Sequence, residues 1–128
     1  MDSQSDIHIG FDGIYDEDFK NGVLEALELL PENFLKQLNN VSIVVEENQP
    51  REMGGFVLGL YRGVPQPYKG PHYSFIMPDK ISLYKRNIMK IALQRNMELK
   101  KIIAEVLYHE IGHYFGLSED ELDLFRSF

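Results

Sequence analysis

The segment that decides the fold runs from Glu98 to Glu119 and reads ELKKIIAEVLYHEIGHYFGLSE. Its apolar residues recur every three or four positions, so they share one face of a helix: Ile103, Val106, Leu107, Ile111 and Tyr114. This periodicity is typical of an amphipathic α-helix that packs against a core. It predicts a helix over about residues 98–115, the most regular pattern in the chain.

Two histidines and a glutamate occur inside this predicted helix, as His109, Glu110 and His113. At about 100° per residue the two histidines lie about 40° apart around the axis and one turn apart along it, so both imidazoles can reach one cation. Glu110 lies about 60° from His113, where its carboxylate can contact a water beside that cation without binding the cation. The spacing also occurs by chance, but here it lies in the middle of an amphipathic helix that ends at a glycine. The pattern predicts a Zn²⁺ site with His109 and His113 as ligands and Glu110 as general base.

Gly116 follows the motif and is suited to end the helix in the left-handed conformation, which turns the chain back on itself. Glu119, three residues later, could then supply a third metal ligand. A second interpretation is equally consistent with the residues. Ser118 and Glu121 have the spacing of a capping box that opens a short terminal helix, in which acidic residues favour the first turn. Both interpretations stay open at this point.

The rest of the chain predicts an α+β domain. A helical stripe covers about residues 16–30 and is ended by Pro31. Apolar and β-branched runs predict three strands, over residues 41–45, 56–61 and 81–84. A short apolar stripe at helical spacing predicts a further helix over residues 86–95. Lys80, Lys85 and Arg86 flank the strand at Ile81–Tyr84 and favour an edge position for it. We expect an irregular loop over residues 63–78, and one domain over residues 1–128 with residues 1–12 as a loose leader.

Composition excludes several classes of protein. The chain has 128 residues, 44% hydrophobic residues and 0 cysteines, so a disulfide scaffold, a thiol nucleophile and a cysteine-bound zinc are ruled out. A net charge of −7 argues against a broad nucleic-acid-binding surface. Neither a signal-peptide pattern nor an apolar run of about 18 residues is visible, so we expect no membrane partner and a cytoplasmic location.

The chain resembles the minimal-zincin, or zincin-like metallopeptidase, family of small bacterial proteins. The resemblance covers roughly residues 40–124 and lies in three segments: Leu58–Pro65, Pro78–Tyr84 and the motif helix through Glu119. It implies a small mixed sheet of about three to four strands packed by an active-site helix, with His109 and His113 as zinc ligands and Glu110 as general base. The family usually has Asp at the third-ligand position. This sequence has Glu119 there and Asp120 next to it, and either could take that role.

Several further residues have both a functional and a structural interpretation. A tyrosine hydroxyl could donate to a developing oxyanion, or it could lie at the edge of the core; the candidates are Tyr61, Tyr73, Tyr84 and Tyr108. His72 could contact substrate or be solvated in its loop. The basic run from Lys80 to Lys101 could bind nucleic acid, although a solvated face explains it more simply.

Two functions from different classes follow from these residues. The first is a zinc-dependent hydrolase, a metallopeptidase whose partner is a peptide or protein substrate paired with an exposed strand edge, for which Ile81–Tyr84 is the candidate. The second is a non-catalytic metal-binding interaction module, a degenerate zincin. A nucleic-acid accessory role through Lys80–Lys101 is a third hypothesis, and no nucleic-acid partner is expected. The residues do not indicate an oligomeric state.

Overall fold

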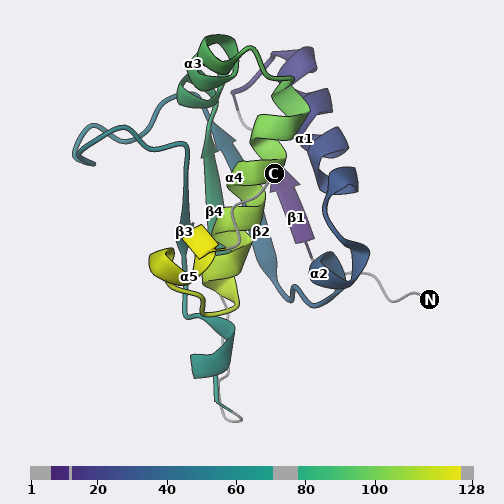
Figure 1. The fold of residues 1–128 in the computed structure, drawn as a ribbon, viewed down its shortest axis with the longest axis vertical. Coiled ribbons are helices and arrows are strands. Elements are labelled where there is room, and N and C mark those ends of the chain that lie inside the picture. Colours follow the sequence, from purple (N-terminus) through teal and green to yellow (C-terminus); the bar gives the residue numbers. More distant parts are fainter. Residues whose placement is uncertain (1–6, 12, 71–77, 125–128) are drawn as a thin grey trace.

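The computed structural model describes residues 7–11, 13–70 and 78–124 (Figure 1). Four strands and five α-helices occupy these residues, with one short 3₁₀-helix, η1, at Gln66–Tyr68. The strands are β1 (Ile7–Gly10), β2 (Val41–Glu46), β3 (Gly59–Arg62) and β4 (Asp79–Tyr84). The helices are α1 (Glu17–Leu29), α2 (Glu32–Lys36), α3 (Lys85–Arg95), α4 (Leu99–Tyr114) and α5 (Glu119–Leu124). The predicted α+β fold with a small mixed sheet is therefore confirmed.

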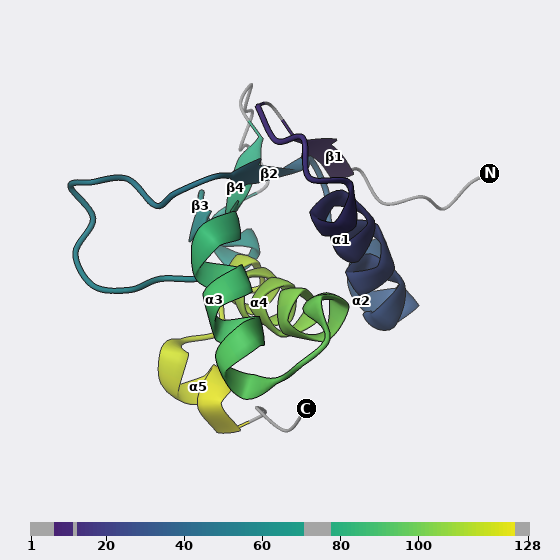
Figure 2. The same ribbon diagram turned by 90° about the horizontal axis from the view of Figure 1, so that it is seen from above.

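The sheet has the strand order β1-β2-β4-β3, and the helices cover one of its faces (Figure 2). β1, β2 and β4 are parallel, whereas β3 is antiparallel to β4 and forms one edge. Alternate residues of β2 are buried, as expected for a strand with one covered face. α4 packs on the sheet and against α1 and α3. Its apolar residues complete the core with those of the strands: Ile103, Leu107 and Ile111 of α4, Ile43 of β2, and Ile81 and Leu83 of β4.

The prediction that Ile81–Tyr84 is an edge strand is wrong. β4 lies between β2 and β3, and Ile81, Leu83 and Tyr84 are almost fully buried. The flanking charges suggested an edge, but ion pairs with carboxylates accommodate them beside an inner strand. Lys80 pairs with Glu46 of the neighbouring strand, and Lys85 already belongs to α3. The exposed edge beside α4 is β3 instead.

β3 begins at Gly59, three residues later than the predicted strand at residues 56–61. β4 ends at Tyr84 and the chain turns at once into α3, so β3 has no backbone partner before Leu58. The Tyr84 amide donates to the Leu58 carbonyl at 3.0 Å, and this is the last backbone bond of the ladder. Residues 56 and 57 therefore need other partners.

Part of the expected leader is a strand. Ile7–Gly10 pairs in parallel with residues 41–44 of β2, so the prediction of a loose segment is wrong for these four residues. Its alternation was too short to be recognised without the partner strand. Residues 1–6 and 12 lie outside the described residues.

Local signals set the helix boundaries. The Asp16 carboxylate accepts the Phe19 amide at 3.0 Å and caps α1, and the extended backbone of Leu30 before Pro31 ends it. Asn96 ends α3 in the left-handed conformation, at a φ of 52°. Within the residues described, no helix combines the length and the hydropathy that crossing a membrane requires.

Candidate metal centre

α4 presents His109 and His113 on the side that faces β3. Their rings lie 4.9 Å apart between centroids and nearly perpendicular to each other, and 22% of each side chain is exposed. The opposite side of the helix packs into the core through Ile103, Leu107 and Ile111. Because that side is fixed, the two imidazoles are held at the border between the core and solvent.

The end of α4 turns the chain back toward these histidines. Gly116 has a φ of 91°, and two hydrogen bonds close the turn, from the Gly116 amide to the His113 carbonyl and from the Leu117 amide to the Gly112 carbonyl. This pair of bonds is the Schellman motif, which needs a left-handed residue that glycine adopts without strain. The predicted role of Gly116 is confirmed.

The capping box that opens α5 is also confirmed. The Ser118 hydroxyl accepts the Glu121 amide at 3.1 Å, and the Ser118 amide donates to the Glu121 carboxylate at 2.8 Å. This cap uses Glu121 and leaves the Glu119 carboxylate available. The two interpretations of the segment are therefore compatible.

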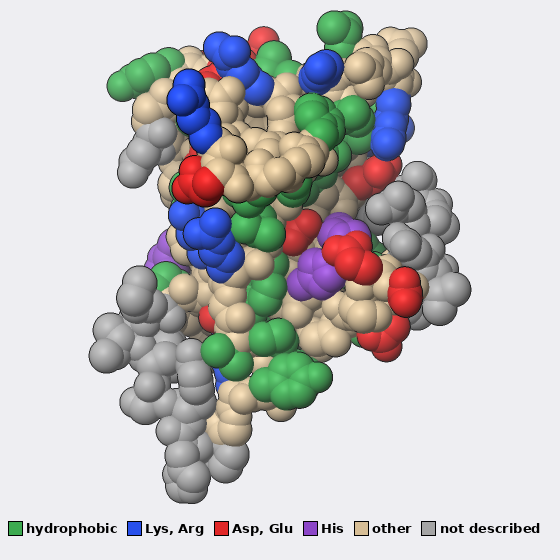
Figure 3. Space-filling view, turned by 90° about the vertical axis from the view of Figure 1, so that its left-hand side faces the viewer, with side chains coloured by type: hydrophobic (Ala, Val, Ile, Leu, Met, Phe, Trp, Pro, Cys, Tyr) green, Lys and Arg blue, Asp and Glu red, His purple; other side chains and the backbone are tan. Residues whose placement is uncertain are grey.

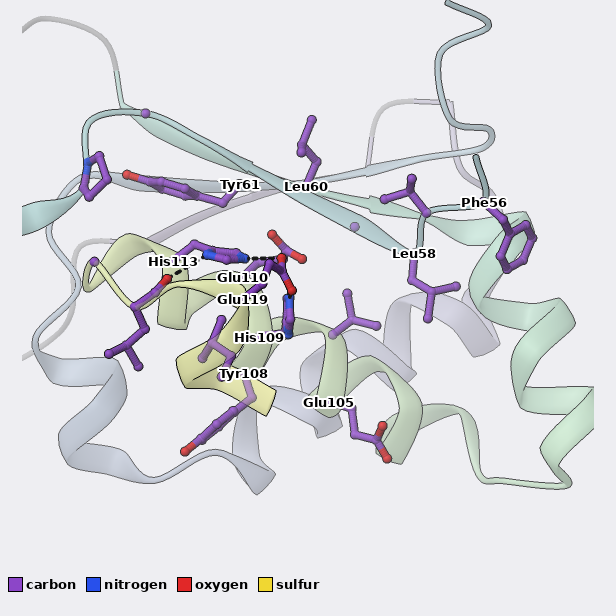
Figure 4. Close-up of a pocket in the computed structure, with 18 of the residues that line it drawn as sticks. Phe56, Leu58, Leu60, Tyr61, Glu105, Tyr108, His109, Glu110, His113 and Glu119 are labelled. Atoms are coloured by element: carbon purple, nitrogen blue, oxygen red, sulfur yellow. Dashed lines mark hydrogen bonds and ion pairs between the residues drawn. The ribbon is translucent and has the colours of Figure 1, made fainter. Parts of the chain in front are cut away.

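Glu119 reaches both histidines from α5 (Figure 4). Its Oε1 lies 3.0 Å from His109 Nε2, and its Oε2 lies 2.8 Å from His113 Nε2. The three candidate ligand atoms, one each from His109, His113 and Glu119, all lie within 4.8 Å of one another. These three residues are called the metal group below. Asp120, the alternative third ligand, is exposed on α5 and is not part of this group.

The His113 ring shows that this group fits a cation. Its Nδ1 lies 2.9 Å from the Leu117 carbonyl, which can only accept, so Nδ1 carries a proton. In the neutral ring Nε2 then has a lone pair, and it faces a carboxylate oxygen at 2.8 Å. Two acceptors this close require a proton or a cation to join them. Two imidazole nitrogens and one carboxylate oxygen, with a second hydrogen bond orienting one ring, form a suitable donor set for Zn²⁺.

Glu110 lies beside this group but is buried, with 8% of the residue exposed. It packs under β3, where a Cβ on Gly59 would lie 3.5 Å from Glu110 Cγ and 2.7 Å from a Val106 methyl. Gly59 is therefore the residue that lets β3 approach α4 this closely. Burial raises the pKa of Glu110 above its ordinary value, and the two histidines and the Tyr61 backbone oppose this increase.

Glu119 has the opposite pKa shift. Partial burial alone would raise its pKa, but the hydrogen bonds and charges of His109 and His113 together outweigh burial and lower it. One carboxyl of the site thus binds a proton more readily than an ordinary glutamate, and the other binds a proton less readily. This separation of two neighbouring carboxyls is typical of sites that use one as base and one as ligand.

The family comparison agrees with this geometry. The sequence model of the family described as "Zincin-like metallopeptidase" matches residues 38–126. The chain belongs to this zincin-like family. The match begins just before β2 and includes β2, β3, β4, α3, α4 and α5, so it contains all three residues of the metal group. A search among curated proteins found no match.

A groove of about 770 Å³ runs along β3 of the zincin-like domain, and the metal group lies in its wall. Figure 3 shows histidine and acidic side chains gathered on one face of the molecule, with apolar side chains next to them. At one end the groove is lined by Phe56, Val57, Leu58 and Val106, and at the other by Tyr61, Pro65, Tyr68 and Leu117. Its volume is in the range of sites that bind small molecules or a few residues of a peptide.

The tyrosine candidates differ in what the structure allows. The Tyr61 hydroxyl donates to the Asp79 carboxylate at 2.6 Å, so its proton is already engaged. Tyr84 is buried in the core and does not line the groove. Tyr108 lines the groove and stacks on Phe34 with 5.1 Å between ring centroids. Tyr73 and His72 lie outside the described residues.

The basic run from Lys80 to Lys101 is divided among β4, α3 and α4. Four of its cations pair with carboxylates: Lys80 with Glu46, Lys85 with Asp16 and Glu47, Arg86 with Glu47, and Lys101 with Glu98.

The sequence patterns did not identify Gly59 or the role of β3. A glycine inside an apolar strand was the signal available, because such a glycine often marks a close approach of another element.

Proposed function

We propose that this zincin-like domain is a zinc-dependent hydrolase that cleaves peptide bonds. One observation carries the proposal: two imidazole nitrogens and a carboxylate oxygen converge at one point of an open groove, and a separate buried carboxyl lies beside them. A purely structural metal site does not require an additional glutamate or an open groove.

His109, His113 and Glu119 would hold the metal in this proposal. Zinc held by three protein ligands makes a water molecule acidic enough to lose a proton near neutral pH and polarises a carbonyl group. The Leu117 carbonyl would keep the His113 ring in the required tautomer and orientation.

Glu110 would act as the general base. Its carboxylate would accept the proton of the attacking water and then donate it to the nitrogen of the leaving amine. Burial suits it to this role because it raises the affinity of the carboxylate for a proton. Gly59 would keep Glu110 in place by allowing β3 to pack directly over it.

The substrate would lie extended along β3. β3 is the edge of the sheet next to the metal group, and an edge strand can pair its outward N–H and C=O groups with another extended chain. In the antiparallel ladder, Leu58 bonds to β4, so the backbone of Gly59 points away from β4. This edge replaces Ile81–Tyr84 as the candidate for substrate pairing.

Zinc content and peptide cleavage test the proposal together. The purified chain should bind about one zinc ion, and His113→Ala should lose it. His8→Ala, the same change in β1, is the matched control and should keep it. Glu110→Gln should keep zinc but lower the rate of peptide cleavage by about 100-fold or more. Unchanged cleavage by folded Glu110→Gln would disprove the mechanism.

One observation favours the alternative, a non-catalytic metal-binding module. The hydroxyl of Tyr61, the tyrosine of β3, already donates its hydrogen bond to the Asp79 carboxylate at 2.6 Å. A hydrogen-bond donor to the oxyanion that develops during peptide cleavage would then have to come from another residue. Zinc binding that raises the melting temperature, without Glu110-dependent cleavage of a broad peptide library, would favour this alternative.

A further inference from the structure

The loop between β2 and β3, residues 47–58, extends away from the body of the domain before it returns to the groove (Figures 1 and 2). Its last three residues, Phe56–Leu58, form one wall of the groove, and Val106 of α4, which lies next to Gly59, also lines it. In Figure 4, Phe56 and Leu58 of this wall lie at one end of the groove and Tyr61 lies at the other, with the metal group between them. The position of the wall therefore determines how wide the groove is on that side of the site.

A side-chain amide closes this loop. Gln49 Nε2 donates to the carbonyls of Met53 and Gly55 at 3.2 and 3.0 Å. Gln49 Oε1 accepts the Val57 amide at 3.0 Å and Asn87 Nδ2 at 2.8 Å. These bonds use both donors and both acceptor sites of the amide group, so the loop is organised around this one side chain.

Asn87 fastens the same point to α3. Its Nδ2 also donates to the Val57 carbonyl at 2.8 Å. Both backbone groups of Val57 are thus bound by side chains, its N–H by Gln49 and its C=O by Asn87. The amide pair replaces the strand that is missing here, because β4 ends at Tyr84 and the chain continues as α3.

We infer that Gln49 and Asn87 are positioning residues for substrate selection: they hold the Phe56–Leu58 wall so that the groove next to the metal group accepts an apolar side chain. This inference rests on the proposed function, since it concerns a side chain of the polypeptide bound there. The wall and Val106 are apolar, and Arg95 and Glu105, which also line the groove, have opposite charges. Contact with buried carbon is therefore the main source of selectivity.

Hydroxamates provide probes that do not depend on catalysis, because the hydroxamate group chelates zinc. Three probes are compared on the zinc-loaded protein. The first is acetohydroxamic acid, the smallest. The other two are larger hydroxamates that are identical except for the side chain on the carbon next to the hydroxamate carbonyl, which is methyl in one and isobutyl in the other. In the unmodified protein the isobutyl probe should bind at least about tenfold more tightly than the methyl probe.

Gln49→Ala and Asn87→Ala should reduce this preference to about twofold or less and leave the affinity for acetohydroxamic acid unchanged. Asn87→Asp keeps the size of the side chain but removes both hydrogen-bond donors, so it should have the same effect. Hydrogen exchange of the Val57 amide should become faster in all three variants. Gln94→Ala and Asn21→Ala make the same substitutions at exposed positions of α3 and α1, and should change none of these quantities.

Two failures can be distinguished. If acetohydroxamic acid does not bind to the zinc-treated protein, the proposed function fails and this inference fails with it. If acetohydroxamic acid binds and the variants keep the full isobutyl preference, while Val57 exchanges faster, the inference alone is wrong. Melting temperatures of the variants identify any general unfolding, and Asn87→Asp provides a second folded variant if the alanine variants do not fold.

Discussion

The two helices that meet at the metal group differ in how the fold holds them. α4 has 16 residues, and nine of them are buried between the sheet, α1 and α3. α5 has six residues, and Leu122 is its buried side chain within the described part of the chain. The histidines therefore come from the most strongly packed helix, whereas Glu119, 66% exposed, comes from a short helix that its cap and the buried Leu122 help to hold. From this difference we infer that the core fixes two of the proposed ligands and that α5 adjusts the strength of the proposed site.

The largest effect should come from removing the carboxylate that α5 contributes. Glu119→Gln removes the charge but keeps the size of the side chain, and we expect zinc affinity to fall by about 30-fold or more, since even the hydrogen-bond partners of zinc ligands contribute about 10- to 100-fold. Asp120→Asn, the same type of change one residue later, should have almost no effect because Asp120 is not part of the group. A competition titration with a zinc chelator measures both affinities. Equal losses in the two variants would mean that α5 binds through either carboxylate.

A smaller effect should follow from moving α5 without changing a ligand. A Cβ on Gly112 would overlap a methyl group of Leu122, so the two could not both stay in place. Gly112→Ala should therefore displace Leu122 and α5 and weaken zinc binding by about five- to tenfold. The thermal stability should change little, because alanine favours the helix by about as much as the overpacking costs, roughly 1 kcal/mol.

Gly22 of α1 provides the matched control for this change. A Cβ there would lie 3.2 Å from the end of the Ile103 side chain, also against α4 but away from α5. Gly22→Ala should leave zinc affinity unchanged. Equal zinc affinities of Gly112→Ala and the unmodified chain would show that α5 does not need Leu122 to position Glu119.

The same contrast explains how much the sequence could predict. The apolar period of α4, the glycine that ends α4 and the cap of α5 depend on residues close together in the chain, so the sequence alone predicted them. The turn at Gly116 made Glu119 a candidate ligand, but its position also depends on how α5 lies on Gly112, a contact that no local pattern contains. The position of β4 inside the sheet depends on pairing with β2, which comes from a distant part of the chain. The sequence did not predict the wall at Val57, because the side chains of Gln49 and Asn87, and not a neighbouring strand, bind its backbone groups.

The smallest expected effect compares two helix caps of similar chemistry. Ser118 caps α5 beside the metal group, and Asp16 caps α1, which packs against α4, each by accepting a backbone amide. Loss of such a cap costs about 1 kcal/mol. Ser118→Ala should weaken zinc binding by no more than about fivefold and hardly change the melting temperature. Asp16→Ala should leave zinc affinity unchanged and lower the melting temperature by roughly 4 °C.

The pH dependence of stability separates these caps further. The Phe19 amide, more than the charge of Lys85, lowers the pKa of Asp16 below its ordinary value of 3.8. A carboxyl with a lowered pKa in the folded state contributes its stability above the unfolded value and loses it as the pH falls through the folded value. The deficit of Asp16→Ala should thus be complete at neutral pH and shrink below about pH 4. Melting curves of the metal-free chain across this range measure it. A Ser118→Ala variant that lost as much thermal stability as Asp16→Ala would show that α5 belongs to the cooperative core, and the contrast between the two helices would then be wrong.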